Sequence, residues 1–361
     1  MSHYLKFRRI PLRELKEIIL PGIKCLLPIL LCIAPINSLA QSAEQTSQSQ
    51  SSEISSSQSV ADNARPLPPG QNVERELRDG ETHAYTITLT TGEFWRATFV
   101  APNLKTELSF FAPGGARIIS YRRQDLSEQK QRPVVLVAEA SGAYRLEVRA
   151  AGKEKAEGLY RIEAIDVRAA TGVDKTLFAA LKMNDEAEIL ESDHTAESNR
   201  QAAAKYEEAG ALLRAVGERT DESDALNKAG QIRFLLAEYQ QALDAFNRAV
   251  EAARLAADSR REYTATANIG TVYTFVGDQP KALDYYNRTL ALAQALGNKK
   301  DQATLLNNIG QAYSRMSENA KALDYYNRAL PLARAERDVK QEASTLNNIA
   351  SIFDRQGESA K

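Results

Sequence analysis

The sequence of 361 residues predicts a multi-domain protein, in which a small antiparallel β-sandwich precedes an all-α solenoid of repeated helical hairpins. Three observations predict this architecture. Apolar residues recur at every second position between residues 71 and 167, as they do in half-buried strands. From residue 172 onward they recur at every third or fourth position, which is typical of amphipathic helices. The eight residues KALDYYNR also occur twice, at 281–288 and 321–328.

Residues 1–40 have the features of an export signal. Six Lys and Arg residues, against two Glu, lead into the apolar stretch 25–36. This stretch is too short to span a bilayer and has about the length of a signal-peptide core. The small residues at 38 and 40 predict cleavage after Ala40, which makes the mature protein periplasmic or extracellular. The alternative is an uncleaved N-terminal anchor, which would be the chain's only contact with a membrane.

The distribution of cysteine and charge excludes several kinds of chemistry. Both cysteines, Cys25 and Cys32, lie in the export signal, so the mature chain has no disulfide, thiolate metal site or cysteine nucleophile. The signal also carries the excess of basic residues, which leaves the rest of the chain mildly acidic. Nucleic-acid binding usually needs a basic surface. We therefore expect no nucleic acid, cofactor or metal as a partner.

Residues 41–70 are predicted to form a disordered linker. The stretch 41–64 is rich in Ser and Gln and nearly free of apolar residues. It cannot bury enough surface to offset the entropy lost on ordering. The prolines of 65–70 are expected to stiffen its end.

Residues 71–167 are predicted to form the β-sandwich, of about 100 residues. Tyr85, Ile87 and Leu89 alternate with smaller or polar residues, and turn sequences containing Gly separate this run from similar ones. Aromatic residues at alternating positions are typical of a core, but they could also stack on a carbohydrate. The residues concerned are Tyr85, Trp95, Tyr121 and Tyr144.

From residue 172 the chain is predicted to form stacked helical hairpins: two opening helices and a degenerate first repeat in 172–221, then regular repeats in 222–361, the last one truncated. One hairpin cannot bury its apolar stripe alone, so each must pack on the next. Residues that coincide when the units are aligned at 40-residue intervals are interpreted as packing positions. They are Gly230, Gly270, Gly310 and Ala350; Ala242, Ala282 and Ala322; and Phe246, Tyr286 and Tyr326.

These units resemble tetratricopeptide repeats. A Leu precedes Ile-Gly, a Tyr follows the Gly by three residues, and Ala, aromatic and Ala positions recur in the second helix. The run TLNNIG and the 40-residue period are similar to the kinesin light chain variety of the repeat. The resemblance covers residues 200–361. It implies that the first helices line a concave groove that binds a peptide or partner protein.

The order of signal, small sandwich and repeats is also similar to the N-terminal part of exported bacterial proteins that end in a CHAT domain, a caspase-like peptidase with a His/Cys dyad. In that resemblance the sandwich corresponds to a pre-peptidase C-terminal-like domain. The present sequence stops before any such peptidase, within a repeat. We therefore expect a fragment whose open last repeat could self-associate. We also expect a scaffold rather than an enzyme, with the regulatory part of a larger peptidase as the alternative.

Recurrent Asn residues in the first helices are the candidate peptide-binding groups. Asn is a mediocre helix former, so its recurrence at fixed places needs a reason. Its amide offers both a donor and an acceptor to an extended chain, but it could equally join neighbouring helices, and the sequence leaves both readings open. The two Arg residues of the set favour an acidic peptide. The candidates are Asn227, Gln231, Asn268, Asn307, Asn308, Gln311, Arg315, Asn347, Asn348 and Arg355.

Neither histidine of the mature chain has a recognisable catalytic partner in the sequence. We expect His83 on the surface of a strand and His194 on the surface of a helix. The repeated Asn-Arg pairs at 247–248, 287–288 and 327–328 belong to the second helices and are expected to face solvent.

Overall fold

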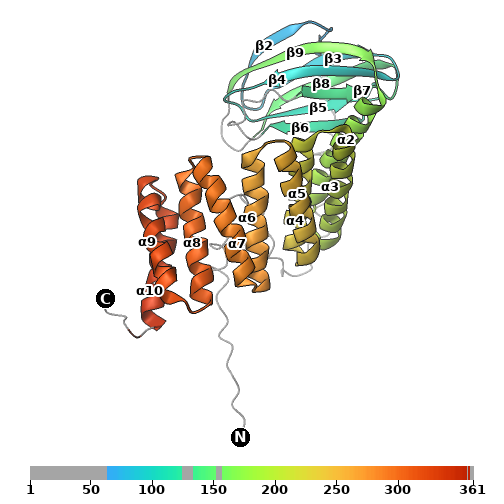
Figure 1. Ribbon diagram of the computed structural model, residues 1–361. Helices are drawn as coiled ribbons and strands as arrows, with labels where there is room; N and C mark the ends of the chain where they lie inside the picture. The colour runs from blue at the N-terminus through green and yellow to red at the C-terminus, as the bar shows by residue number, and fades with distance from the viewer. Residues whose placement is uncertain (1–62, 124–132, 152–156, 356, 358–361) are drawn as a thin grey trace, which may run out of the picture. The chain divides into compact units, whose positions relative to one another are not determined.

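The computed structural model describes residues 63–123, 133–151, 157–355 and 357 (Figure 1). The predicted export signal and most of the predicted linker lie outside the described residues. The chain divides into two compact units at Ala256 and Ala257. The first contains the described strands and helices α2–α5, and the second contains helices α6–α10. Within the described part of the chain, no helix is both long and apolar enough to cross a membrane.

Two sheets form a β-sandwich in the first unit, which confirms the predicted fold of this region. Neighbouring strands are antiparallel, except that β1 runs parallel to β3. One sheet has the order β1 (Arg65–Pro66), β3 (Thr82–Leu89), β8 (Gly142–Ala150), β5 (Thr106–Phe111) and β6 (Arg117–Arg123). The other has the order β2 (Asn72–Leu77), β9 (Gly158–Ala169), β4 (Glu93–Val100) and β7 (Pro133–Val137).

The sandwich begins earlier than the sequence indicates. Strand β1 lies within the range assigned to the linker, and the side chain of Leu67 directly after it is buried in the core. The backbone N–H of Leu67 also donates to the carbonyl of Thr86 on β3. Strand pairing, this hydrogen bond and the buried Leu67 side chain together attach the segment to the sheet.

The alternating residues of the strands fill the space between the two sheets. Tyr85, Trp95 and Tyr144 are each only 1% exposed. The ring of Trp95 packs edge-on against Phe110, with 5.6 Å between ring centroids. Tyr121 is half-buried, and its hydroxyl donates to the carbonyl of Val135 at 2.6 Å. The idea that these aromatic residues form a carbohydrate-stacking surface is therefore wrong.

His83 is half-buried rather than exposed on the strand surface, because it ends a chain of hydroxyl groups. The hydroxyls of Tyr85 and Tyr160 are 2.6 Å apart, and that of Tyr160 is 2.8 Å from His83 Nδ1. Arg75 can only donate, and it does so to the Tyr85 hydroxyl at 3.4 Å. Nε2 of His83 lies 3.7 Å from the carboxylate of Glu81.

Helices fill the remainder of the described chain, and turns of two or three residues join them (Figure 1). Helices α2 (Gly172–Ser192), α3 (Ala196–Val216), α4 (Arg219–Leu235) and α5 (Tyr239–Leu255) belong to the first unit. Helices α6 (Ser259–Val276), α7 (Gln279–Ala295), α8 (Lys299–Arg315), α9 (Asn319–Ala335) and α10 (Val339–Arg355) form the second. His194 lies in the turn after α2 with φ of 54°, not on a helix as the sequence suggested.

Helix α2 joins the sandwich to the helices that follow it. Its Phe178 is 3% exposed and belongs to the core of the sandwich. Its Ala180 and Ala187 are fully buried in the core that α2 shares with α3, α4 and α5. Ion pairs surround the contact between α2 and the strands: Arg117–Asp185 (2.9 Å), Arg122–Glu188 (3.0 Å), Lys182–Glu139 (2.9 Å) and Arg168–Asp174 (2.6 Å).

A close contact between a glycine and an aromatic ring holds each regular hairpin together. A Cβ atom built on Gly310 would lie 2.6 Å from the ring of Tyr326. The matching distances are 2.7 Å from Gly270 to Tyr286 and 2.6 Å from Gly230 to Phe246. In each hairpin the ring thus lies directly on the backbone of the first helix. The nearby alanines of the second helices, Ala242, Ala282 and Ala322, are fully buried.

Replacing Gly310 with Ala should destabilise the second unit. Overpacking a close contact costs about 1 to 3 kcal/mol, which exceeds the about 1 kcal/mol that Ala gains over Gly in helix propensity. Circular dichroism during urea unfolding measures the change. The control is Gly172→Ala at the start of α2, where an added Cβ meets no atom within 4 Å, and its stability should be unchanged or higher. An equal loss in both variants would contradict the role of the ring contact.

Acidification should destabilise the sandwich through His83. Burial, followed by the charge of Arg75, lowers the pKa of His83 below its ordinary value of 6.5. The unfolded chain therefore binds more protons than the folded one just below pH 6.5, so this stabilisation is complete above pH 6.5 and is lost as the pH falls. Trp95 is the chain's single tryptophan, and its fluorescence during urea unfolding at pH 8 to 5 reports on the sandwich.

The variant His83→Gln should show a weaker pH dependence of unfolding than the wild type over this range. The exposed His194 provides the matched control, and His194→Gln should keep the wild-type dependence. If His83→Gln retains the full dependence, then carboxylates rather than this imidazole cause the loss of stability.

Candidate functional site

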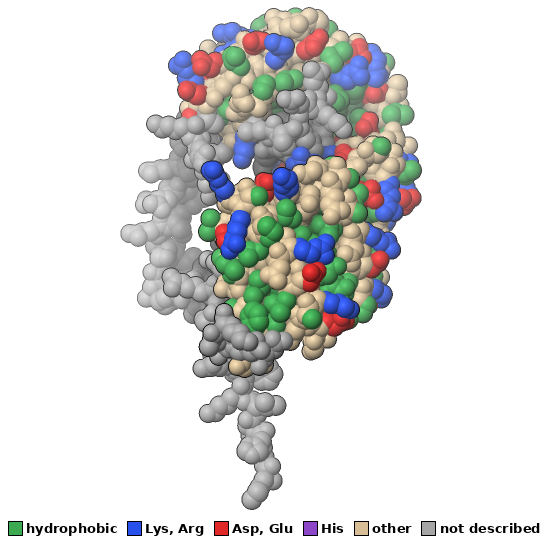
Figure 2. Space-filling model, turned by 60° about the vertical axis from the view of Figure 1, so that its left-hand side comes forward, with side chains coloured by type: hydrophobic (Ala, Val, Ile, Leu, Met, Phe, Trp, Pro, Cys, Tyr) green, Lys and Arg blue, Asp and Glu red, His purple; other side chains and the backbone are tan. Residues whose placement is uncertain are grey.

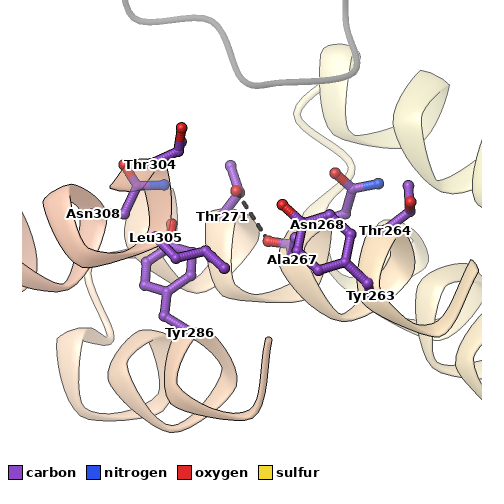
Figure 3. Close-up of a pocket in the computed structure, with 9 residues that line it drawn as sticks. All are labelled: Tyr263, Thr264, Ala267, Asn268, Thr271, Tyr286, Thr304, Leu305 and Asn308. Atoms are coloured by element: carbon purple, nitrogen blue, oxygen red, sulfur yellow. Dashed lines mark hydrogen bonds between the residues drawn. The ribbon is translucent and has the colours of Figure 1, made fainter. Parts of the chain in front are cut away.

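A pocket lies between the first helices α6 and α8 of the second unit, with Tyr286 of α7 below it (Figure 3). The helices contribute amide, hydroxyl and apolar side chains, and none of the lining residues carries a charge. They are Tyr263, Thr264, Ala267, Asn268 and Thr271 of α6, Thr304, Leu305 and Asn308 of α8, and Tyr286.

Two of the candidate Asn residues line this pocket. Asn268 and Asn308 occupy the same place in successive repeats, and both are half-buried. Between them lie the buried side chains of Leu305 and Tyr286. The site thus combines an apolar base with amides at its rim, an arrangement that small, oriented ligand sites commonly use.

Threonine hydroxyls form a second polar component of the pocket that the sequence analysis missed. Thr264 donates to the carbonyl of Arg260 (3.1 Å), and Thr271 donates to that of Ala267 (3.1 Å). Thr304 donates in the same way to the carbonyl four residues earlier, at 3.2 Å. Thr264 and Thr304 are 40 residues apart, so the repeat alignment contained a signal for them.

The charged groups nearest to the pocket are paired with one another. Tyr263 lies beside Asp301, and burial together with this carboxylate raises the pKa of Tyr263. Burial also raises the pKa of Asp301, although the charge of Arg260 opposes this shift. Lys300 forms an ion pair with Asp338 at 3.3 Å. The lining of the pocket is therefore uncharged, and both the carboxylate of Asp301 and the charge of Arg260 lie at its margin.

Another pair of candidate Asn residues joins neighbouring helices. Asn307 is 3% exposed, and its Oδ1 accepts a hydrogen bond from Asn348 Nδ2 at 3.0 Å. This bond links α8 to α10, so it supports the stacking reading for these two residues.

The remaining Asn and Gln candidates do not line the pocket. Asn347 is exposed, and Gln311 is half-buried. Of the remaining candidates, Asn227 and Gln231 are half-buried on α4 in the first unit.

The two candidate Arg residues also connect successive first helices. Arg315 donates to the carbonyl of Thr274 at the end of α6 (3.3 Å), and Arg355 donates to Ser314 Oγ at the end of α8 (2.6 Å). Both side chains are exposed, and neither lines the pocket. Their recurrence therefore corresponds to a repeated contact between helix ends.

The Asn-Arg pairs of the second helices face solvent, as predicted, with only Arg248 half-buried. Each Arg forms an ion pair with the Asp four residues earlier, as Arg288 does with Asp284 at 2.8 Å. The guanidinium groups of Arg288 and Arg328 also lie over the rings of Tyr285 and Tyr325. Such contacts are typical of the solvent-exposed side of a helix rather than of a binding site.

Helix α10 has an apolar side that the described residues leave exposed. Leu346 is 42% exposed, whereas the corresponding Leu306 of α8 is 5% exposed under α9. Ala350, the residue that aligns with the buried glycines, is exposed as well. Helices α9 and α10 lie on the left of Figure 1, and Figure 2 turns this side towards the reader. Hydrophobic side chains gather on it among Lys and Arg side chains. Self-association through this surface stays a prediction.

Within the described residues, no group of three or more His, Cys, Asp and Glu side chains is arranged to hold a metal ion.

The comparisons with known proteins identify the helical region. Residues 221–295, 261–335 and 301–361 match the model of the tetratricopeptide repeat family. Residues 221–361 therefore match tetratricopeptide repeats, a repeat type typical of protein–protein interaction scaffolds. No curated protein matches the sequence.

Solved structures similar to this chain include the apo form of RapI, with 15% identity, a TM-score of 0.45, and coverage of 49% of this chain and 64% of RapI. Aspartyl phosphate phosphatase F from Bacillus subtilis has 16% identity and a TM-score of 0.44, over 52% of this chain and 49% of its own. The nearly identical TPR-like repeats of a Podosopora anserina kinesin light chain have 10% identity and a TM-score of 0.42, with coverage of 49% of this chain and 88% of their own. This chain thus spans less than two thirds of RapI and of the phosphatase.

Replacing Asn307 with Ala should destabilise the second unit by about 1 kcal/mol, because it removes a partly buried hydrogen bond and leaves the Asn348 amide without this acceptor. Urea unfolding followed by circular dichroism measures the change. The adjacent Asn347→Ala is the control, since this side chain is exposed and Ala is the better helix former. Equal destabilisation by both variants would show that the Asn307–Asn348 bond is not what matters.

Proposed function

We propose that this protein is an exported scaffold whose tetratricopeptide repeats bind an extended segment of a partner protein in the groove of their first helices. The observation that carries the proposal is the pocket in which the amides of Asn268 and Asn308 border the buried side chains of Leu305 and Tyr286. Amides can pair with both the N–H and the C=O of a peptide backbone. The shallow apolar base below them can contact a side chain of the same segment.

The spacing of the two amides suits an extended ligand. An extended chain advances about 3.3 Å per residue. Asn268 and Asn308 recur once per repeat on α6 and α8, so a segment that follows the groove can contact them in succession. A peptide that follows the groove in this way would need no secondary structure of its own.

Export is the second part of the proposal. It is supported by the basic start of the chain, the short apolar stretch 25–36 and the small residues at 38 and 40. Mass spectrometry of the protein from the periplasmic or extracellular fraction tests this part. A mature N-terminus at Gln41 supports cleavage after Ala40, whereas an intact N-terminus in the membrane fraction supports the anchor.

The alternative is that the scaffold forms the regulatory N-terminal part of a larger caspase-like peptidase. The order of signal, sandwich and repeats favours it. An antibody raised against the sandwich distinguishes the two possibilities on an immunoblot of native cell fractions. A band well above the mass of this chain supports the peptidase, and a band slightly below that mass supports a separate exported scaffold.

The double variant Asn268→Ala/Asn308→Ala should weaken peptide binding at least tenfold, since one lost hydrogen bond contributes about 1 kcal/mol. Peptides selected on the wild-type chain from a random twelve-residue display library serve as ligands, with affinity measured by fluorescence anisotropy. The control is Asn287→Ala/Asn327→Ala, which removes two exposed amides from the second helices and should leave affinity unchanged.

Circular dichroism separates this outcome from a structural one. If the helical signal or the melting temperature of the Asn268→Ala/Asn308→Ala variant falls, these amides stabilise the stacking of the helices. Retained helicity with unchanged affinity would instead exclude the pocket as the binding site.

A further inference from the structure

The pocket between α6 and α8 offers more hydrogen-bond acceptors than donors. Thr264 and Thr271 each give their hydroxyl proton to a carbonyl of their own helix, and Thr304 gives its proton either to such a carbonyl (3.2 Å) or to Gln341 Oε1 (3.4 Å). A hydroxyl has one proton and two acceptor lone pairs, so these three side chains present acceptors to any ligand in the pocket. Figure 3 shows this bond for Thr271.

The hydroxyl of Tyr286 also contacts α6. It lies 2.9 Å from the hydroxyl of Thr274, which itself donates to the carbonyl of Gly270 at 3.0 Å. The ring of Tyr286 therefore contributes an apolar surface to the pocket, and its hydroxyl is held against threonine hydroxyls of α6.

No positive charge in the lining offsets this excess of acceptors. The nine lining residues are uncharged, and the neighbouring Lys300 is paired with Asp338. Arg315 makes its contact at the C-terminal end of α6, and the carboxylate of Asp301 lies beside Tyr263 at the margin. An anionic group that entered the pocket would therefore lose its hydration and find no cation among the lining residues, although the charges of Arg260 and Arg315 act on Asp301 at its margin and on Tyr286 at its base.

We infer that the pocket selects a peptide segment that is free of Asp and Glu and brings its own donors, namely backbone N–H groups and the side chains of Ser, Thr, Asn or Gln. This inference rests on the proposed function and specifies the ligand of the same site. It differs from the preference for an acidic peptide that Arg315 and Arg355 suggested, because neither of these Arg side chains lines the pocket. A carboxylate within the bound segment should lower affinity at least about tenfold.

A random twelve-residue peptide display library, selected on the full chain, tests the inference by the composition of the enriched peptides. The pool should be depleted of Asp and Glu, and enriched in Ser, Thr, Asn and Gln, relative to the unselected library. The same selection on Thr304→Lys, which replaces an acceptor at the rim with a cation, should shift the pool towards acidic peptides. Circular dichroism confirms that the variants used remain helical.

The outcomes separate this inference from the proposed function. A pool rich in Asp and Glu that depends on Asn268 and Asn308 would overturn the inference while the proposed function stands. A Thr304→Lys pool with the wild-type composition would also overturn it, because the lining would then not determine the charge of the ligand. If no peptide is enriched on the wild type over the Asn268→Ala/Asn308→Ala variant, the proposed function itself fails. A neutral pool that depends on both Asn residues supports both.

Discussion

An aromatic ring that lies on a glycine backbone fixes the geometry of each regular hairpin. Because no Cβ atom intervenes at Gly270, the ring of Tyr286 approaches the first helix closely enough to set the distance between the two helices. The same ring forms the base of the pocket between α6 and α8. The packing contact and the candidate binding site therefore share one side chain, and the depth of the site follows from how closely two backbones approach.

The periods of the sequence predict the fold because each reflects one buried side of an element. The repeat alignment also identifies Gly and its aromatic partner, since identical neighbours need identical contact residues. Features without a period could not be predicted in this way. Strand β1 is too short to alternate, and the burial of His83 depends on Tyr160, which lies 77 residues away in the sequence.

Two of the candidate residues, Asn268 and Asn308, line the pocket, whereas the different positions of neighbouring candidates could not be predicted from the sequence. Asn307 and Asn308 are the same residue type at adjacent positions, yet one bonds to α10 and the other lines the pocket. A rotation of one residue, with 3.6 residues per turn, separates these roles, and only the packing of the helices decides which residue points where. The reach of Arg315 to Thr274 depends in the same way on a neighbouring helix.

Both sides of helix α2 pack against neighbouring elements. Phe178 belongs to the core of the sandwich, and Ala180 and Ala187 belong to the core of the helices. The sandwich therefore closes one end of the helices in its unit. Repeat proteins change length when a duplicated unit inserts between two similar surfaces. At α2 one of those surfaces is a β-domain with its own charge pattern, so gains and losses of repeats in the evolution of this chain should be confined to positions after α3.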